Sequence, residues 1–258
     1  MNKGIGIAGI AGRMGRLLAE EVAAANLTLA GGIDRPGATI EGARPYADIA
    51  ALAAAADVVV DFTHASTAAG HARALAAAGT AWVLGTTGLT AADDAAVAEA
   101  ARHVPVVYAP NFSTGVNLVL ALAERMAAAL PAGQYDAEIV EMHHRQKVDA
   151  PSGTAIGLGR AVAKGRGVVL EEVAESGRQG HTGARRTGAI GFAALRGGQV
   201  VGEHTLLFAG ATEHIAITHR AFDRRAFATG AVRAALWTRG RPAGLYSMMD
   251  VLGISGVA

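Results

Sequence analysis

The chain has 258 residues, of which 51% are hydrophobic and 17% charged, and its formal net charge is +1. This composition is typical of a globular protein with much apolar surface to bury, and it argues against disorder. The near-neutral charge gives no reason to expect nucleic acid as a partner, because such binding requires a basic face. The absence of cysteine excludes disulfides, thiolate zinc sites and a cysteine nucleophile.

The N-terminal sequence MNKGIGIAGIAGRMG has one lysine and a short apolar run that glycines interrupt. It lacks the unbroken apolar segment and the cleavage site of a signal peptide. No stretch of the sequence approaches the roughly 20 apolar residues that a membrane-spanning helix needs. We therefore expect a cytoplasmic protein that does not associate with a membrane.

Short β-type runs alternate with longer helical runs over the first 110 residues. The expected strands cover residues 3–7, 27–33, 58–62, 82–84 and 104–109, and the expected helices cover 13–25, 48–56, 67–78 and 91–102. This alternation is typical of βαβ units. It predicts an α/β fold with a Rossmann-type, doubly wound parallel sheet.

The pattern changes after Asn111. Helices are expected over residues 116–130, 152–164 and 225–239, and strands over 137–142, 190–195, 200–208 and 214–221. Three successive strands with only short turns between them predict a second α+β domain with an open antiparallel or mixed sheet. We expect the last helix to return to the first domain, which then comprises residues 1–112 and 224–258, while residues 113–223 form the second.

A glycine-rich segment follows the first expected strand and contains Gly9, Gly12 and Gly15. Glycines here allow a sharp turn that brings backbone N–H groups to a pyrophosphate at the helix N-terminus. The spacing differs by one residue from the commonest dinucleotide-binding form, and ordinary strand–helix turns also use glycine. Asp34 strengthens the interpretation, because it ends the second strand nineteen positions after Gly15 and would accept hydrogen bonds from the adenosine ribose.

Further candidate contacts of a dinucleotide flank this turn and follow later strands. Arg35 would pair with a 2′-phosphate that Asp34 would repel, so the pair favours NADH with tolerance of NADPH. Arg13 is either a phosphate ligand or a solvated surface residue. The loops 85–88 and 109–112 follow strands at the edge where open α/β sheets bind ligands, so each is a nicotinamide contact or simply a turn.

The densest polar cluster is EMHHRQKVDAPSGT at residues 141–154, which leaves a strand and enters a helix at Ser152. The helix start offers N–H groups to an anion, and Ser152 could cap it. Lys147 adds a positive charge, and His143 and His144 add donors that titrate near neutral pH. Together these groups suit a substrate that carries carboxylates.

The polar cluster also has alternative interpretations. Glu141 and His143 lie on one face of the expected strand and could bind a metal ion, but no third ligand follows at a useful spacing, so no metal site is predicted. A solvated polar loop is the other alternative. His204, on a later strand, either faces the site or packs in the core. The remaining histidines are expected to be structural or on the surface: His64, His71, His103, His181, His214 and His219.

The sequence as a whole resembles the 4-hydroxy-tetrahydrodipicolinate reductase (dihydrodipicolinate reductase) family. The resemblance rests on GRMGR at 12–16, GTTG at 85–88, APNFSTGVN at 109–117, EMHHRQKVDAPSGTA at 141–155, GRQGHTGAR at 177–185, IGFAALRGGQVVGEHT at 190–205, EHIAITHRA at 213–221 and FATGAVRAALW at 227–237. The segment HHRxKxDAPSGTA is very specific, and its order with the others makes coincidence improbable.

The resemblance implies NADH- or NADPH-dependent reduction of 4-hydroxy-tetrahydrodipicolinate, a small dicarboxylate, in diaminopimelate and lysine biosynthesis, by a homotetramer. It implies His143 as proton donor, Lys147 as second donor or carboxylate anchor, and substrate contacts from His144, Gly153 and Thr154. The implied cofactor-binding residues are Gly9, Ile10, Ala11, Gly12, Arg13, Met14, Asp34, Arg35, Gly85, Thr86, Thr87, Ala109, Pro110, Asn111 and Phe112. The first domain would then bind the dinucleotide, and the second would bind substrate and form the oligomer.

Two other classes of function stay open on the sequence. One is a different Rossmann-fold dehydrogenase of amino-acid metabolism, against which the HHRxKxDAPSGT segment argues. The other is a non-catalytic nucleotide-binding sensor, against which the retained histidine and lysine donors argue.

Overall fold

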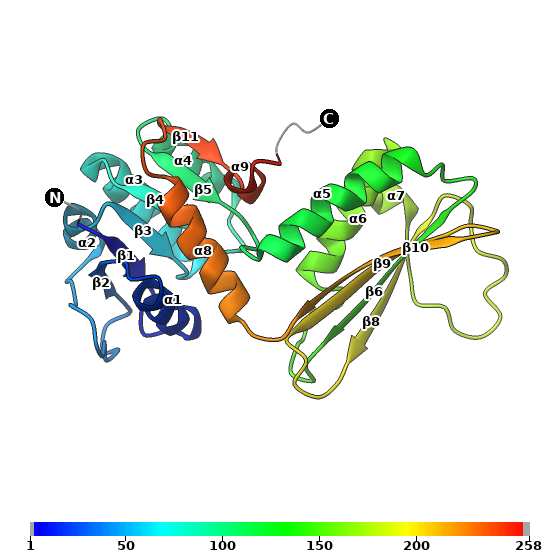
Figure 1. The fold of residues 1–258 in the computed structure, drawn as a ribbon, viewed down its shortest axis with the longest axis horizontal. Helices are drawn as coiled ribbons and strands as arrows, with labels where there is room; N and C mark the ends of the chain where they lie inside the picture. The colour runs from blue at the N-terminus through cyan, green and yellow to red at the C-terminus, as the bar shows by residue number, and fades with distance from the viewer. Residues whose placement is uncertain (1–2, 255–258) are drawn as a thin grey trace. The chain divides into compact units, whose positions relative to one another are not determined.

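The computed structural model describes residues 3–254, and the chain divides into two compact units (Figure 1). One unit comprises the chain up to Thr114 together with the part from Arg224 onward. The other unit comprises Gly115–Asp223. The first contains a parallel sheet covered by helices and the second a mixed sheet, so the predicted fold class is confirmed.

The sheet of the first unit has six strands in the order β11-β5-β4-β3-β1-β2, all parallel. The strands are β1 Ile5–Ala8, β2 Leu29–Ile33, β3 Val58–Asp61, β4 Ala81–Leu84, β5 Pro105–Tyr108 and β11 Gly244–Tyr246. Every residue of β1, β3 and β4 is buried. Such continuous burial is the mark of a parallel sheet with helices on both faces.

Alternate residues of these strands face two separate hydrophobic clusters. One cluster contains Ile7, Val60 and Val83, and the other contains Val59 and Trp82. The first cluster also takes in α1 Arg13–Ala24, α8 Arg225–Trp237 and α9 Met248–Leu252; the second takes in α2 Ile49–Ala55, α3 Ala68–Ala78 and α4 Ala91–Ala100. Because successive side chains of a strand point to opposite faces, the helices form two layers around the sheet.

The order of the strands fixes where a ligand would bind. The chain leaves β1 through α1 to β2 on one side, and then crosses through α2 to β3 on the other side of β1. A single parallel bridge between Gly32 and Pro45 adds a rudimentary strand beyond β2. Open α/β sheets bind ligands beyond the carboxyl ends of their strands at such a reversal, which here is the glycine-rich turn after β1.

The sheet of the second unit has five strands in the order β10-β9-β6-β8-β7. These are β6 Asp136–His143, β7 Ala174–Ser176, β8 Ile190–Arg196, β9 Gly202–Ala209 and β10 His214–Ala221. β9 runs antiparallel to β6 and β10, whereas β8 runs parallel to β6 and β7, so the sheet is mixed. Its helices are α5 Thr114–Ala129, α6 Gly153–Arg166 and α7 Leu170–Val173.

One face of this second sheet is covered and the other is not. Ile139, Phe192 and Phe208 pack with α5 and α6 in a third hydrophobic cluster. On the opposite face, Val140 is 39% exposed and Leu195 is 51% exposed. The second unit therefore presents a sheet face with exposed apolar side chains that none of its own helices buries.

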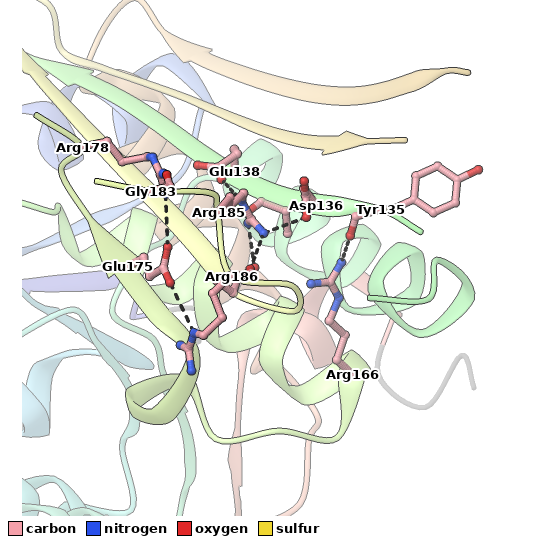
Figure 2. Close-up of polar contacts among 11 residues, drawn as sticks. Tyr135, Asp136, Glu138, Arg166, Glu175, Arg178, Gly183, Arg185 and Arg186 are labelled. Carbon is pink, nitrogen blue, oxygen red and sulfur yellow. Dashed lines mark hydrogen bonds and ion pairs between the residues drawn. The ribbon is translucent and has the colours of Figure 1, made fainter. Parts of the chain in front are cut away.

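Arginines fasten the long loop between β7 and β8, and Arg185 makes the most contacts with β6 (Figure 2). The Arg185 guanidinium donates to Asp136 Oδ1 and Glu138 Oε1, both at 2.7 Å, and to the carbonyl oxygens of Ala137 and Ala189. Because the loop has no regular ladder of backbone hydrogen bonds, these side-chain contacts hold its returning arm against β6.

Several predicted element ends fall on caps. The sequence pattern places Asp48 and Ser152 inside helices, but each residue precedes its helix as the N-cap. The Asp48 side chain accepts a hydrogen bond from the Ala51 N–H, and the Ser152 side chain accepts one from the Ala155 N–H. A 3-10 turn, η1 Ala65–Thr67, precedes α3, and β9 begins at Gly202 rather than residue 200. The helix α8 packs in the first unit, where Arg225 binds Glu20 and Glu21 of α1.

The packing of α8 gives a stability prediction. A Cβ on Gly230 would collide with the main-chain oxygen of Phe112. We expect Gly230→Ala to reduce the free energy of unfolding by about 2 kcal/mol, because overpacking outweighs the roughly 1 kcal/mol by which alanine favours a helix. Denaturant unfolding measures the change. Gly70→Ala in α3, where a Cβ meets nothing within 4 Å, is the control and should be neutral or stabilising; equal losses would contradict this argument.

Candidate active site

The glycine-rich turn of the first unit is tight and leaves the start of α1 uncovered. Gly9 has a φ of +84°, a left-handed conformation that favours glycine, and its N–H donates to the Ile33 carbonyl at 2.9 Å. A Cβ on Gly15 would collide with Gly9 and Ile10. Gly12 is the N-cap of α1 and places no side chain over the helix end. The first N–H groups of the helix, which lack intrahelical acceptors, are therefore suited to an anion.

Asp34 lies beside this turn, as expected. Its Oδ2 accepts a hydrogen bond from the Ala11 N–H and its Oδ1 accepts one from the Arg35 N–H, both at 2.8 Å. Arg13 and Arg35 are exposed, and Met14 packs partly against the core. Ile10 is 4% exposed with its side chain in the core, so only its backbone could contact a cofactor.

The two candidate nicotinamide loops meet at the end of β3. The Gly85 N–H donates to the Asp61 carbonyl at 2.9 Å, and a Cβ on Gly85 would collide with the Phe62 ring. Thr86 is buried and its hydroxyl donates to the Thr63 carbonyl at 3.1 Å. In the other loop, the Phe112 ring lies 5.7 Å from the Phe62 ring.

The other predicted residues of these loops differ in solvent exposure and in their hydrogen bonds. Thr87 and Pro110 are exposed, whereas Ala109 is buried and its N–H donates to the Leu84 carbonyl. The Asn111 side chain accepts a hydrogen bond from the Ser113 N–H at 2.8 Å, which fixes the turn.

Residues 61–63 contact both loops but are not among the predicted site residues. Asp61 is fully buried and accepts hydrogen bonds from the Thr63 N–H and hydroxyl, at 3.0 and 2.6 Å, and from Trp82 Nε1 at 3.3 Å. His71 Nδ1 lies 2.7 Å from the same carboxylate, so this histidine is structural, as expected. The sequence does carry one indication of this segment, because the expected strand at 58–62 ends at the same sheet edge as both loops.

In the second unit, the end of β6 carries a buried charged cluster. Glu141 is 1% exposed, and Arg196 binds both of its oxygens at 2.8 Å. His143 Nδ1 lies 2.6 Å from Glu141 Oε2, and the Ser152 N–H donates to Oε1 at 3.1 Å. Arg196, at the end of β8, was not predicted.

Burial and charge act in opposite directions on this pair. Burial alone would raise the pKa of Glu141, but the hydrogen bonds from Arg196, His143 and Ser152 outweigh it and lower the pKa, so the carboxylate is ionised. For His143, burial lowers the pKa and outweighs the hydrogen bond to Glu141, which raises it. The charges of Lys147 and Arg196 lower it further.

His204 faces this cluster, which decides between its two predicted environments. Its ring lies 5.1 Å from the His143 ring in an edge-on arrangement, and its Nε2 lies 3.1 Å from Ser152 Oγ. Burial, and then the neighbouring His143, lower the pKa of His204 to about 4. His204 is therefore neutral at ordinary pH.

The remaining candidates lie between β6 and α6. Lys147 Nζ is 2.8 Å from Asp149 Oδ1, and the Lys147 N–H donates to the His144 carbonyl at 3.1 Å. Gly153 is exposed and Thr154 half-buried in the first turn of α6. The Lys147 side chain is 21% exposed, and its charge lowers the pKa of His143.

The described residues contain neither a grouped metal site nor a membrane-spanning helix. Within residues 3–254, no three or more histidine, aspartate or glutamate side chains are grouped so as to hold a metal ion. Glu141 and His143 do share a face, but Arg196 occupies both carboxylate oxygens. Among the helices of the same residues, none is both long and apolar enough to cross a membrane.

A parallel sheet of this order with a glycine-rich turn after its first strand is typical of dinucleotide-binding oxidoreductases. Residues 3–112 match the family described as "Dihydrodipicolinate reductase, N-terminus", and residues 115–252 match "Dihydrodipicolinate reductase, C-terminus". The chain belongs to the dihydrodipicolinate reductase family.

Relatives agree with this assignment, and a solved structure shares the fold. The chain is 72% identical to a 4-hydroxy-tetrahydrodipicolinate reductase from Granulibacter bethesdensis over 97% of both chains. It is 63% identical to one from Gluconacetobacter diazotrophicus, again over 97% of both. Its fold is similar to that of a dipicolinate-bound dihydrodipicolinate reductase from Paenisporosarcina sp. TG-14, with a TM-score of 0.76 and 24% identity over 95% of this chain and 97% of that one.

The buried His204 predicts an acid-side loss of stability. Between pH 6.5 and 4 the unfolded chain protonates this histidine and the folded chain does not, so stability falls as the pH falls through that window. The full effect is up to about 3 kcal/mol. Denaturant unfolding at pH 7.5, 6, 5 and 4.5 measures it. His204→Gln removes the titrating ring and should flatten the dependence; an unchanged slope in that variant would contradict the assignment.

Proposed function

We propose that this protein reduces 4-hydroxy-tetrahydrodipicolinate to tetrahydrodipicolinate with NADH or NADPH, a step of diaminopimelate and lysine biosynthesis. The observation that carries the proposal is the buried cluster at the end of β6. There His143 Nδ1 lies 2.6 Å from Glu141 Oε2, and the charge of Lys147 lowers the pKa of His143. The high identity to proteins named for this reaction supports the same conclusion.

The residues of the first unit suit NADH or NADPH. We assign the pyrophosphate to the backbone of residues 9–14 at the start of α1, where the uncapped N–H groups favour an anion. Asp34 keeps carboxylate lone pairs for the ribose hydroxyls, and the exposed Arg35 and Arg13 are placed for phosphate groups. The nicotinamide is assigned to residues 85–87 and 109–112. When bound, the cofactor supplies the hydride.

The residues of the second unit suit a dicarboxylate. A solved structure of a dihydrodipicolinate reductase carries dipicolinate, a ring with two carboxylates. We assign one carboxylate to the first turn of α6, at Gly153 and Thr154, and the other to Lys147, with His144 beside them. A cation and a helix N-terminus both stabilise negative charge.

His143 is the proposed proton donor. Its Nδ1 faces the Glu141 carboxylate, so Nε2 is the nitrogen that remains for the substrate. The substrate first loses its hydroxyl group as water. A hydride and a proton then add to the resulting unsaturated ring, and the protonated His143 delivers the proton from Nε2 to the atom that gains electrons. Lys147 orients the carboxylates and stabilises the negative charge that develops.

We also propose a homotetramer, assembled through the sheet face that the helices of the second unit leave uncovered. Exposed apolar side chains on that face, Val140 and Leu195 among them, support an interface between copies of the chain. We place the reaction in the cytoplasm, where the cysteine-free sequence suits a reducing environment.

The reaction is tested by the loss of NADH or NADPH absorbance, with substrate generated in place from pyruvate and aspartate semialdehyde by the upstream synthase. We expect oxidation that depends on the synthase. Lys147→Ala should reduce kcat/KM by about 10²–10³-fold, because it removes a charge from the site, and should leave NADH affinity nearly intact.

Lys164→Ala provides the matched control, since Lys164 also pairs with a carboxylate but is 72% exposed on α6. It should retain normal turnover. Near-normal turnover of Lys147→Ala would refute the role of that lysine. Binding of NADH without synthase-dependent oxidation would instead favour another dehydrogenase or a nucleotide sensor.

The tetramer has its own test. Val140→Glu combined with Leu195→Glu places like charges on the uncovered sheet face, and we expect the tetramer to dissociate into smaller species in multi-angle light scattering. Val168→Glu, at a residue 41% exposed outside the sheet, should leave the mass unchanged. A wild-type protein that is monomeric at micromolar concentration would contradict the proposal.

A further inference from the structure

Glu141 is the most completely enclosed charge of the second sheet, and the proposed reaction does not use it directly. Four hydrogen-bond donors surround its two oxygens. Oε2 receives Arg196 Nη1 at 2.8 Å and faces His143 Nδ1 at 2.6 Å; Oε1 receives Arg196 Nη2 at 2.8 Å and the Ser152 N–H at 3.1 Å. A buried carboxylate with this many donors acts only as an acceptor.

This geometry determines the tautomer of His143. Because Glu141 can only accept, Nδ1 of the imidazole must carry the hydrogen. A flipped ring would place a carbon against the carboxylate and lose the 2.6 Å bond. The absence of a side chain on Gly202 preserves the space beside the other nitrogen, since a Cβ there would lie 3.0 Å from His143 Nε2.

We infer that Glu141 is the positioning residue of the proposed proton donor: it holds His143 with Nδ1–H toward the carboxylate and Nε2 toward the substrate, and it stabilises the protonated ring. This inference rests on the proposed role of His143. Glu141 itself touches neither substrate nor cofactor in this scheme.

The charges around His143 show why a carboxylate is needed. Arg196 approaches from β8 and Lys147 from the loop after β6, and both disfavour the protonated ring. His204 on β9 is neutral, with His219 of β10 paired with it in register, and Asp149 pairs with Lys147. Among the groups described around the ring, Glu141 is the anion in direct contact with it. Burial lowers the pKa of His143, and Glu141 opposes that shift.

Arg196 affects the pKa of the same ring in the direction opposite to Glu141. It fixes Glu141 through two parallel hydrogen bonds and also donates to the Asp149 and Leu195 carbonyls, so it anchors the carboxylate to β8 and to the loop. Its charge nevertheless disfavours a protonated His143. Removal of Glu141 and removal of Arg196 should therefore move the titration of His143 in opposite directions.

A purely structural role for Glu141, as a partner for Arg196 and the Ser152 N–H, is the competing explanation, and the test must separate the two. We would measure the pH dependence of kcat/KM and the ¹⁵N chemical shifts of the His143 ring in wild type, Glu141→Gln, Glu141→Asp and Arg196→Met. Glu124→Gln, in an exposed ion pair with Lys164, is the control.

We expect Glu141→Gln to reduce kcat by about 10–100-fold, as loss of a group that orients a functional histidine does. It should move the alkaline limb of the profile to lower pH by about one unit and populate the Nε2–H tautomer, while NADH affinity stays unchanged. Glu141→Asp should restore part of each effect. Arg196→Met should move the limb to higher pH, and Glu124→Gln should change nothing.

An unchanged limb and tautomer in a folded Glu141→Gln protein would overturn the inference, as would shifts in the same direction for both Glu141→Gln and Arg196→Met. If Glu141→Gln does not fold, Glu141→Asp and Arg196→Met decide by the direction of their shifts. Failure of the proposed function is distinguishable, because the wild-type protein would then show no synthase-dependent oxidation, whereas the ring tautomer in the variants would still report on positioning.

Discussion

The fold of the first unit depends on one constraint, which is that its parallel strands are apolar on both faces and need helices on both. The segment that ends at β5 supplies α2, α3 and α4 to one face but only α1 to the other. The chain completes the second layer with α8, whose small residues allow close approach to the loop after β5. The second unit is therefore an insertion into the first, bounded by segments that the parallel sheet requires.

Strand geometry then places the chemistry in each unit. Because all strands of the first sheet run the same way, the turn after β1 and the segments after β3, β4 and β5 share one edge. In the second unit, alternation along β6 turns Glu141 and His143 to one face and leaves Val140 on the other. Donors for the buried carboxylate come from β8 and from the start of α6, so the ion pair joins two neighbouring elements to β6.

Local patterns in the sequence predicted the alternation of strands and helices, the glycine-rich turn with Asp34, and the polar segment after β6. It missed α7, β7, β11 and α9, which have three to five residues and are too short to show a period. It also missed the role of Arg196 and left open whether His204 faces the site or packs in the core; these residues lie 55 and 63 positions from Glu141. Their contacts arise from strand register, which pairs Glu141 with His204 and His143 with Arg196, and alternation within one strand cannot reveal register.

The bond between the Asp34 carboxylate and the Ala11 N–H has a consequence for protein engineering. Acidic residues at this position are the usual target for exchanging one dinucleotide for the other, because they contact the ribose. Here the same carboxylate also braces the glycine-rich turn. A redesign that replaces it with a neutral or basic residue removes a structural support together with the proposed ribose contact, so a useful variant would need a new acceptor for the Ala11 amide elsewhere in the loop.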